Sequence, residues 1–593
     1  MKYLRQIPCF ALFSFLFLWL LKGDLLYHME QYSLFSFSGD YLAKFFEQPG
    51  GLLILLGAFF TQFCHFPVLG ALVITLSLCL LAFLVRKAFG LEGKKGLLAL
   101  IPSVFLLLFI TRLDYSIYLQ KTYGLLFSQT LGFAAAVALF ALYRRRFSGR
   151  KSGWLFLLPL IIVGYPLIGS YALVATVLVV LEALRRKKHF VPALVSTLAL
   201  GAAVPLSCAN LPFIYGRMNR HFAFLAAFPY NEFVDNFMCW LPLILAFAAL
   251  VSLVFADSCG RKLPVPVFAA CALAMLGLTN WDANFAAVLK MERAVGSQDW
   301  DKVLQVAAKQ QDPTRIQVLY KNIALYAKGE LTEKMFSYPD GTAPLKTTAD
   351  VPVSMVCSVP VQYWSGMINS SERSAMEFSS SFCRSVFYCK YQAMTALIKG
   401  DLEIARKYMD AIKGCWFQGK WLRRYEAFLE NPGSMASEEE FARLYPLMDF
   451  DGPVADLATS LEASMNRYFD HPDYENENLY EWQMAQLMIQ KREADFCHVF
   501  FERYEKMPQA PVTKGIAEAA SLFGATSGDD DLMSRIAVAL SSRTDILKQF
   551  GQFANAMNIT SDLDAAATRE RFGKRYGGTY WFYYYFTDDI FIN

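Results

Sequence analysis

Residues 22–65 read KGDLLYHMEQYSLFSFSGDYLAKFFEQPGGLLILLGAFFTQFCH, and the interpretation of the whole chain depends on them. They follow a first hydrophobic segment and mix acidic residues with Leu, Phe and Tyr at near-helical spacing. This pattern is typical of segments that lie along a membrane face, and it fits a water-exposed loop or a span less well. Residues 49–62 are apolar, and we interpret them as a re-entrant or interfacial helix because a full span here would invert every later loop.

The two halves of the 593-residue chain differ in composition. Residues 1–280 contain long apolar runs and hold 23 Lys and Arg against 10 Asp and Glu, whereas residues 281–593 hold 33 against 42. The positive charge of the first half lies in short runs between apolar segments, which argues against the clustered basic face of a nucleic-acid-binding protein. We therefore divide the chain into a transmembrane helical domain, 1–280, with 22–65 as its interfacial first external loop, and a second domain, 281–593.

Nine apolar runs of the first half approach the roughly 20 residues that a helix needs to cross a bilayer. They lie at about 4–21, 66–85, 97–111, 124–143, 153–168, 170–184, 190–208, 238–256 and 264–280. With the N-terminus in the cytoplasm, the N-terminal segment and the inner loops hold 17 Lys and Arg, and the outer loops before residue 281 hold six. Nine alternating spans therefore satisfy the positive-inside rule, and residues 281–593 are expected outside the cytoplasm.

The second half predicts paired helices. Residues 300–309 and 315–328 have apolar residues at helical spacing, and residues 389–412 predict two helices joined at Gly400 and Asp401. Paired helices with small residues at their crossing and a glycine turn resemble tetratricopeptide repeats. We expect a few such hairpins across residues 284–430.

Two segments of the second half do not follow the paired pattern. Residues 338–360 contain prolines and are expected to form an insertion. Residues 580–586, YWFYYYF, form a dense aromatic patch that we expect to pack against the helices or to lie on the membrane surface. A platform on which carbohydrate rings stack is a further alternative.

Four phrases of the sequence resemble an uncharacterised family of bacterial multi-pass membrane proteins of unknown function. They are EQYSLFSFS (30–38), PGGLLILLGAFFTQF (49–63), GMINSSERSAMEF (366–378) and GGTYWFYYYF (577–586). In layout the chain also resembles GT-C glycosyltransferases, which share a cytoplasmic N-terminus, an acidic first external loop and many spans, and one branch of which carries external tetratricopeptide repeats. The resemblances imply an all-α protein of the bacterial inner membrane with a periplasmic C-terminal domain.

The GT-C layout implies a carboxylate near the outer bilayer surface and cations for the phosphate of a lipid-linked sugar. The carboxylate, or several together, would deprotonate the acceptor or hold a divalent cation. The candidate catalytic residues are Asp24, Glu30 and Asp114, and the candidate substrate-binding residues are Arg112, Lys121, Arg217, Arg220 and His221. Each candidate also has a plain structural alternative. Asp24 would be a solvated acid beside Lys22, and Arg112 and Asp114 would form a surface ion pair. Arg217, Arg220 and His221 would anchor the chain at the membrane interface. Asp24 and Glu30 are six residues apart, a departure from the near-adjacent acidic pair of the GT-C family.

Two functions remain open on the sequence. The leading one is sugar transfer from a polyprenyl-phosphate donor on the outer face of the membrane, and the alternative is a non-catalytic envelope scaffold whose helical repeats bind partner proteins. The histidines never take the H-E-x-x-H spacing of a zinc protease, and neither a phosphate-binding G-x-x-x-x-G-K-[ST] loop nor a G-x-S-x-G motif occurs. The sequence identifies no cofactor beyond the option of a divalent cation.

Overall fold

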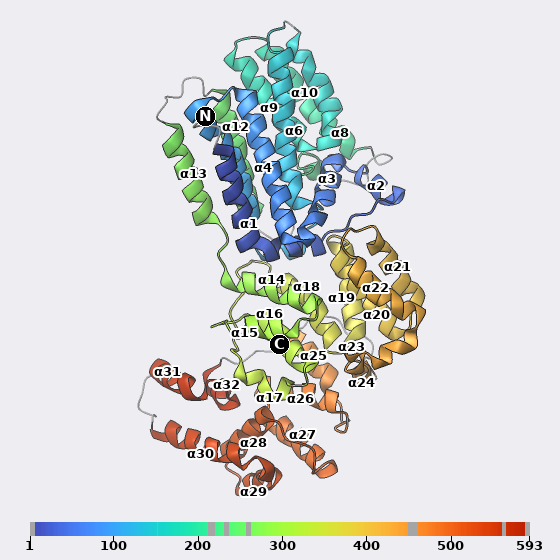
Figure 1. Cartoon of the computed structure of the whole chain (residues 1–593), viewed down its shortest axis with the longest axis vertical. Coiled ribbons are helices and arrows are strands. Elements are labelled where there is room, and N and C mark those ends of the chain that lie inside the picture. Colours follow the sequence, from blue (N-terminus) through green and yellow to red (C-terminus); the bar gives the residue numbers. More distant parts are fainter. Residues whose placement is uncertain are drawn as a thin grey trace.

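The computed structural model describes residues 6–150, 152–211, 220–230, 236–255, 263–448, 461–559 and 565–587. The regular structure in these ranges is helical, apart from one isolated bridge between Thr314 and Ala343. The helices up to α13 form a bundle, and the helices from α14 onward form a second body at one end of that bundle (Figure 1). The protein is therefore all-α in the ranges described.

Within the described residues, five helices are long and apolar enough to cross a membrane. They are α1 (Gln6–Gln31), α4 (Pro67–Phe89), η2 with α5 (Gly93–Thr111), α6 (Leu125–Arg146) and α10 (Phe190–Ala209). A sixth results if α13 (Pro264–Leu278) and α14 (Ala283–Gly296), which meet at a bend of 66°, are counted as one span. The other predicted runs also contain helices, namely α7 (Leu157–Ile162) with α8 (Gly164–Ile168), α9 (Ser170–Arg185), α12 (Asn236–Val254) and α13. The nine crossings stay a prediction.

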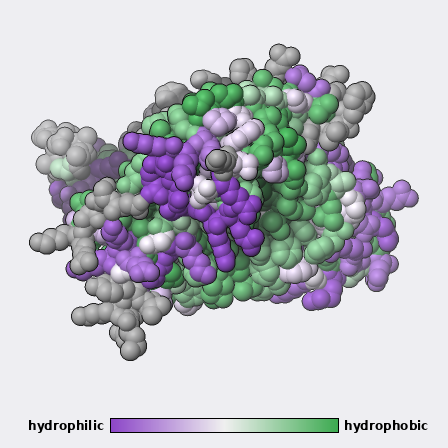
Figure 2. Space-filling model, turned by 90° about the horizontal axis from the view of Figure 1, so that it is seen from above, coloured by the Kyte–Doolittle hydropathy of each residue, from purple (hydrophilic) through white to green (hydrophobic). Residues whose placement is uncertain are grey.

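Basic residues end several helices of the bundle at the end that lies away from the second body. They occupy the last turns of α4, α6 and α9. Seen from above, hydrophilic side chains gather on this end and hydrophobic surface surrounds them (Figure 2). Some of these charges also hold helices together, because buried Glu182 of α9 pairs with Arg144 of α6 at 3.3 Å and with Arg186 at 2.6 Å.

The stretch 22–65 is largely helical, as its near-helical spacing predicts, and its interfacial position stays a prediction. Helix α1 bends at Lys22, where φ is −124° and ψ is 15°, and then continues to Gln31. The chain then forms α2 (Gly39–Phe45), α3 (Gly51–Thr61) and the 3₁₀ turn η1 (Gln62–His65). Asp24, His28 and Glu30 therefore lie on a helical extension of the first span, which points them at the second body.

Consecutive helices of the second body pack on one another, including α14 with α15, α18 with α19 and α20 with α21. The remaining helices are α15 (Trp300–Ala307), α16 (Arg315–Ala327), α17 (Leu331–Lys334), α18 (Asp350–Trp364), α19 (Ile368–Ser381), α20 (Val386–Lys399), α21 (Leu402–Lys413), α22 (Gly419–Glu430), α23 (Glu439–Ala442), α24 (Tyr445–Met448), α25 (Leu461–Phe469), α26 (Glu477–Ile489), α27 (Glu493–Lys506), α28 (Lys514–Ser527), α29 (Asp530–Ala539), α30 (Thr544–Ile559), α31 (Ala565–Tyr576) and α32 (Tyr580–Phe586). Gly400 ends α20 with a φ of +82°, as a left-handed helix C-terminus requires. The tetratricopeptide assignment stays a prediction.

Two segments of the second body settle expectations from the sequence. Helix α18 begins at Asp350 and continues through Pro360, so the second half of the expected insertion 338–360 is helical. Helix α32 packs inward: the hydroxyl of Tyr583 donates to the carbonyl of Ile489 at 2.7 Å, and the indole of Trp581 donates to that of Glu518 at 2.8 Å. The aromatic patch therefore belongs largely to the core, as the packing alternative expected.

Candidate functional site

The extension of α1 meets the second body in what we call the junction cluster: Asp24, His28 and Glu30 with their partners. Asp24 lies first along the helix, and its carboxylate accepts a hydrogen bond from Arg293 of α14 at 3.0 Å. The same guanidinium lies over the ring of Tyr27, 4.7 Å from its centroid. Both charged groups are part-exposed, so this ion pair contributes specificity more than stability.

His28 and Glu292 form the buried centre of the junction cluster. The Nδ1 atom of His28 lies 2.9 Å from a carboxylate oxygen of Glu292, and the hydroxyl of Tyr118 donates to the other oxygen at 2.6 Å. The imidazole also stacks on Tyr32, with ring centroids 4.2 Å apart. Three chain segments therefore converge on one carboxylate: α1, the loop after α5, and α14.

Glu30 is buried and surrounded by amide donors. Its two oxygens accept from Gln418 at 2.7 Å and from Gln31 at 2.6 Å, and His65 lies 3.3 Å away. Gln31 in turn accepts from the ammonium of Lys390 at 3.0 Å. Burial lowers the pKa of Lys390 to about 8, although the charge of Glu30 opposes this shift.

A small cavity opens beside these residues. It measures about 50 Å³ and is lined by Tyr27, Gln31, Glu292, Lys390 and Trp421, among others. A space of this size admits one or a few water molecules and is too small for a sugar. The junction cluster is thus a packed, hydrogen-bonded contact.

The other predicted site residues lie elsewhere. Asp114 caps the 3₁₀ turn η3 (Tyr115–Leu119) by accepting from the amide of Ser116 at 2.9 Å. Arg112 donates to the carbonyl of Leu278 at 3.4 Å, and Lys121 is exposed in the loop before α6. Arg217 lies outside the described residues, and Arg220 and His221 begin α11 (Arg220–Ala223), their side chains also being outside what the structure describes. Within the described ranges no group of three or more His, Cys, Asp or Glu is placed to hold a metal ion, so the implied divalent cation has no evident site there.

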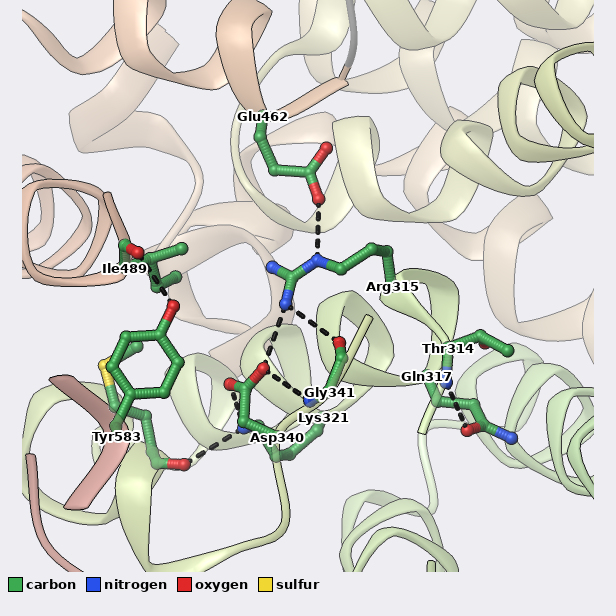
Figure 3. Close-up of polar contacts among 10 residues, drawn as sticks. Thr314, Arg315, Gln317, Lys321, Asp340, Gly341, Glu462, Ile489 and Tyr583 are labelled. Carbon is green, nitrogen blue, oxygen red and sulfur yellow. Dashed lines mark hydrogen bonds and ion pairs between the residues drawn. The ribbon is translucent and has the colours of Figure 1, made fainter. Parts of the chain in front are cut away.

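A second polar cluster lies inside the second body and was not anticipated from the sequence. Arg315 of α16 donates to Asp340 at 2.9 Å and to Glu462 of α25 at 3.1 Å, so its guanidinium lies between two carboxylates (Figure 3). Lys321 donates to Asp340 at 3.4 Å and to the carbonyl of Met335 at 3.0 Å. Burial lowers the pKa of Lys321 despite the attraction of Asp340. No residue pattern distinguishes these charges from the many solvated ones in the sequence.

Two cavities adjoin this cluster. One measures about 360 Å³ and is lined by α16, α18 and α25, with Arg315, Gln362 and Glu462 among apolar side chains such as Met355 and Val361. The other measures about 700 Å³ and is lined by residues of α31, of α32 and of the segment 336–340. Gln362 is one of the residues that line the first cavity, and both of its amide atoms are buried without a hydrogen-bond partner in the described structure. A group that offered both a donor and an acceptor to this amide would remove the cost of leaving it unpaired.

Helices of membrane-spanning length, joined to a second helical body, define the class to which the chain belongs: a helical membrane protein. More narrowly, it is a member of a Family of unknown function (DUF6057), whose profile matches residues 2–587. Neither a curated protein nor a solved structure matches the chain.

Proposed function

We propose that the protein is a non-catalytic scaffold of the bacterial inner membrane whose second helical body binds a partner protein on the outer face. The observation that carries the proposal is the junction cluster, in which Asp24, His28 and Glu30 each bind a residue of the second body: Arg293, Glu292 and Gln418. Acids engaged in this way serve to couple the two parts of the molecule. A coupled pair of this kind suits a protein that holds a partner at a fixed height above the membrane.

In this proposal the bundle crosses the membrane nine times and the second body, built of tetratricopeptide-like hairpins, lies in the periplasm. The cavity between α16, α18 and α25 is the proposed binding place for the partner. An extended peptide segment offers the neighbouring N–H and C=O groups that the buried amide of Gln362 lacks, and the apolar walls would hold a side chain.

Site-specific photo-crosslinking tests this binding place. Val351 lines the cavity and is 64% exposed, and Val538 of α29 is a matched control that is 63% exposed. A photoreactive residue at 351 is expected to give a discrete protein adduct in cells, and the same residue at 538 is not. The adduct should weaken in the Gln362→Leu variant, because the buried amide then no longer pairs with the partner. Adducts at both positions, or an adduct at 351 that is indifferent to Gln362, would contradict the proposal.

Sugar transfer from a polyprenyl-phosphate donor is the second candidate, and one observation favours it. Asp24 lies just beyond the break at Lys22, at the end of the first span, and is part-exposed. The exchange Asp24→Arg with Arg293→Asp separates the two functions. For a scaffold, the exchange restores what either single change impairs, because the ion pair is re-formed. For a transferase, the exchange leaves the envelope glycans as defective as Asp24→Asn does, because position 24 still lacks its carboxylate.

A further inference from the structure

The loop between α21 and α22 reaches back from the second body to the bundle. The amide of Trp416 donates to Gln62 at 2.8 Å, and the thiol of Cys415 donates to the carbonyl of Phe35 at 3.1 Å. Gly414 packs so closely on Ser36 that a Cβ there would lie 2.7 Å from the serine hydroxyl. These contacts fix residues 414–418 against the segment that precedes α4.

The same loop presents two aromatic side chains outward. Trp416 is 40% exposed and Phe417 is 37% exposed, although both rings are large and apolar. Phe417 has a φ of +68°, which non-glycine residues rarely adopt and which the surrounding contacts must maintain. The contacts and the backbone conformation of the loop therefore hold these two rings at the surface.

Aromatic residues of the bundle surround the two rings. Trp416 lies 5.3 Å from Phe59 and 5.7 Å from Phe63 between ring centroids, and Phe417 lies 5.1 Å from Phe66. Phe66, itself half exposed, directly precedes Pro67, at which the candidate span α4 begins. Phe417 consequently lies beside the start of this candidate span.

We propose that Trp416 and Phe417 form a second membrane anchor, with their rings in the boundary between the lipid headgroups and the acyl chains. Amphipathic and aromatic rings are enriched at this depth, where apolar surface is covered and the indole N–H stays near water. Phe417 contacts Phe66 at the start of α4, and the apolar side chains of Val68 and Leu72 in α4 are also exposed. The lipid that covers α4 is therefore the occupant that fits the two rings.

Quenching of tryptophan fluorescence by brominated phosphatidylcholine tests this anchor on the full-length protein in vesicles. Bromine atoms near the carbonyl end of the acyl chains should quench a fraction of the emission, and that fraction should fall in Trp416→Phe. Trp300→Phe is the control, because Trp300 of α15 packs on Trp364 inside the second body, with ring centroids 4.9 Å apart. This change should leave the quenched emission intact.

Two results would overturn the proposal. One is a quenched fraction that Trp416→Phe does not change. The other is emission from Trp416 that aqueous iodide quenches and bromolipid does not, which would place the rings in water or against a soluble protein. Trp416→Phe preserves an aromatic ring, and the helical circular dichroism of the variant verifies that its fold is retained.

Discussion

Glu292 shows how closely single residues of the junction depend on one another, because His28 and Tyr118 both bind its carboxylate in a buried place. In Glu292→Leu the hydroxyl of Tyr118 loses its acceptor, and we expect the free energy of unfolding to fall by about 1–3 kcal/mol. Glu403→Leu, at an exposed position of α21, is the control and should change it by about 0.5 kcal/mol or less. Unfolding in detergent, followed by circular dichroism, measures both. Equal losses in the two variants would show that the junction is not a stabilising contact.

The lowered pKa of Lys390 is expected to make the free energy of unfolding depend on pH. The residues around its ammonium are Gln31 from α1 and Trp421 from α22, with the charge of Glu30 and the thiol of Cys415 nearby. Burial lowers the pKa of Lys390 from 10.5 to about 8, so the unfolded chain binds more protons between these values. The free energy of unfolding should therefore rise from about pH 8 to about pH 10.5 on account of this group, and below pH 8 the full cost of the buried charge remains.

Comparison with Lys390→Met isolates this contribution, because other lysines also titrate at high pH. The rise should be smaller in Lys390→Met than in the wild type. Lys407→Met, at an exposed position of α21, should retain the wild-type profile. Identical profiles for all three proteins would mean that Lys390 is solvated in the folded state.

At this scale the sequence indicated which acids were unusual but not what they bind. Asp24 and Glu30 stand out in the sequence because they are acids among apolar residues directly after the first apolar run. Their partners are far along the chain: Arg293 is 269 residues from Asp24, and Gln418 is 388 residues from Glu30. A single sequence contains no local signal for such pairs, since they depend on how whole helices dock.

Among the elements, α3 gives the clearest test, because two glycines let its backbone touch the start of α6. A Cβ at Gly57 would lie 2.6 Å from the carbonyl oxygen of Gly124, and this backbone atom cannot move aside easily. Gly57→Ala is therefore expected to destabilise the protein by about 1–3 kcal/mol through overpacking. Gly277→Ala in α13, where a Cβ meets nothing within 4 Å, should show no such loss. The thermal unfolding midpoints of the purified variants test this prediction. A midpoint for Gly57→Ala equal to that of the wild type would mean that α3 is not fixed to α6.

Elements with a complete local pattern were predictable, and elements that depend on docking were not. Helices α15 and α16 and the hairpin of α20 and α21 follow from apolar spacing and from the glycine turn at Gly400. The continuation of α1 to Gln31 was missed, because Lys22 and Asp24 resemble the end of a span. The prolines of residues 338–360 predict an insertion, yet Pro360 lies four residues before the end of α18, where burial of its neighbours Val359 and Val361 supports the helix.

For the whole molecule, the bundle is the part that the sequence predicts best, because apolar runs alternate with basic loops along it. The docking of the second body on the bundle is the part that it predicts least. Apolar runs and basic loops are properties of composition, which survive any detail of packing. The contact between bundle and second body is made by scattered polar residues such as Gln62 and Gln418, whose identity does not distinguish an interface from a surface. The arrangement in Figure 1 therefore does not follow from composition alone.

The proposed function depends on which side of the membrane holds the second body. That side is set by whether the number of membrane crossings before the second body is odd or even. Nine spans, or the five candidate spans alone, place the second body opposite a cytoplasmic N-terminus. Counting α13 and α14 as one bent span beyond those five would return it to the cytoplasm. The first outcome is expected, because α1 runs from the end of the bundle that holds the N-terminus to the opposite end, where its extension binds Glu292 and Arg293 of α14. A C-terminal alkaline phosphatase fusion should thus be active and a C-terminal green fluorescent protein dark, while fusions truncated after Arg146 should behave oppositely. A fluorescent C-terminus would place the second body in the cytoplasm and remove both the periplasmic scaffold and the outer-face transferase.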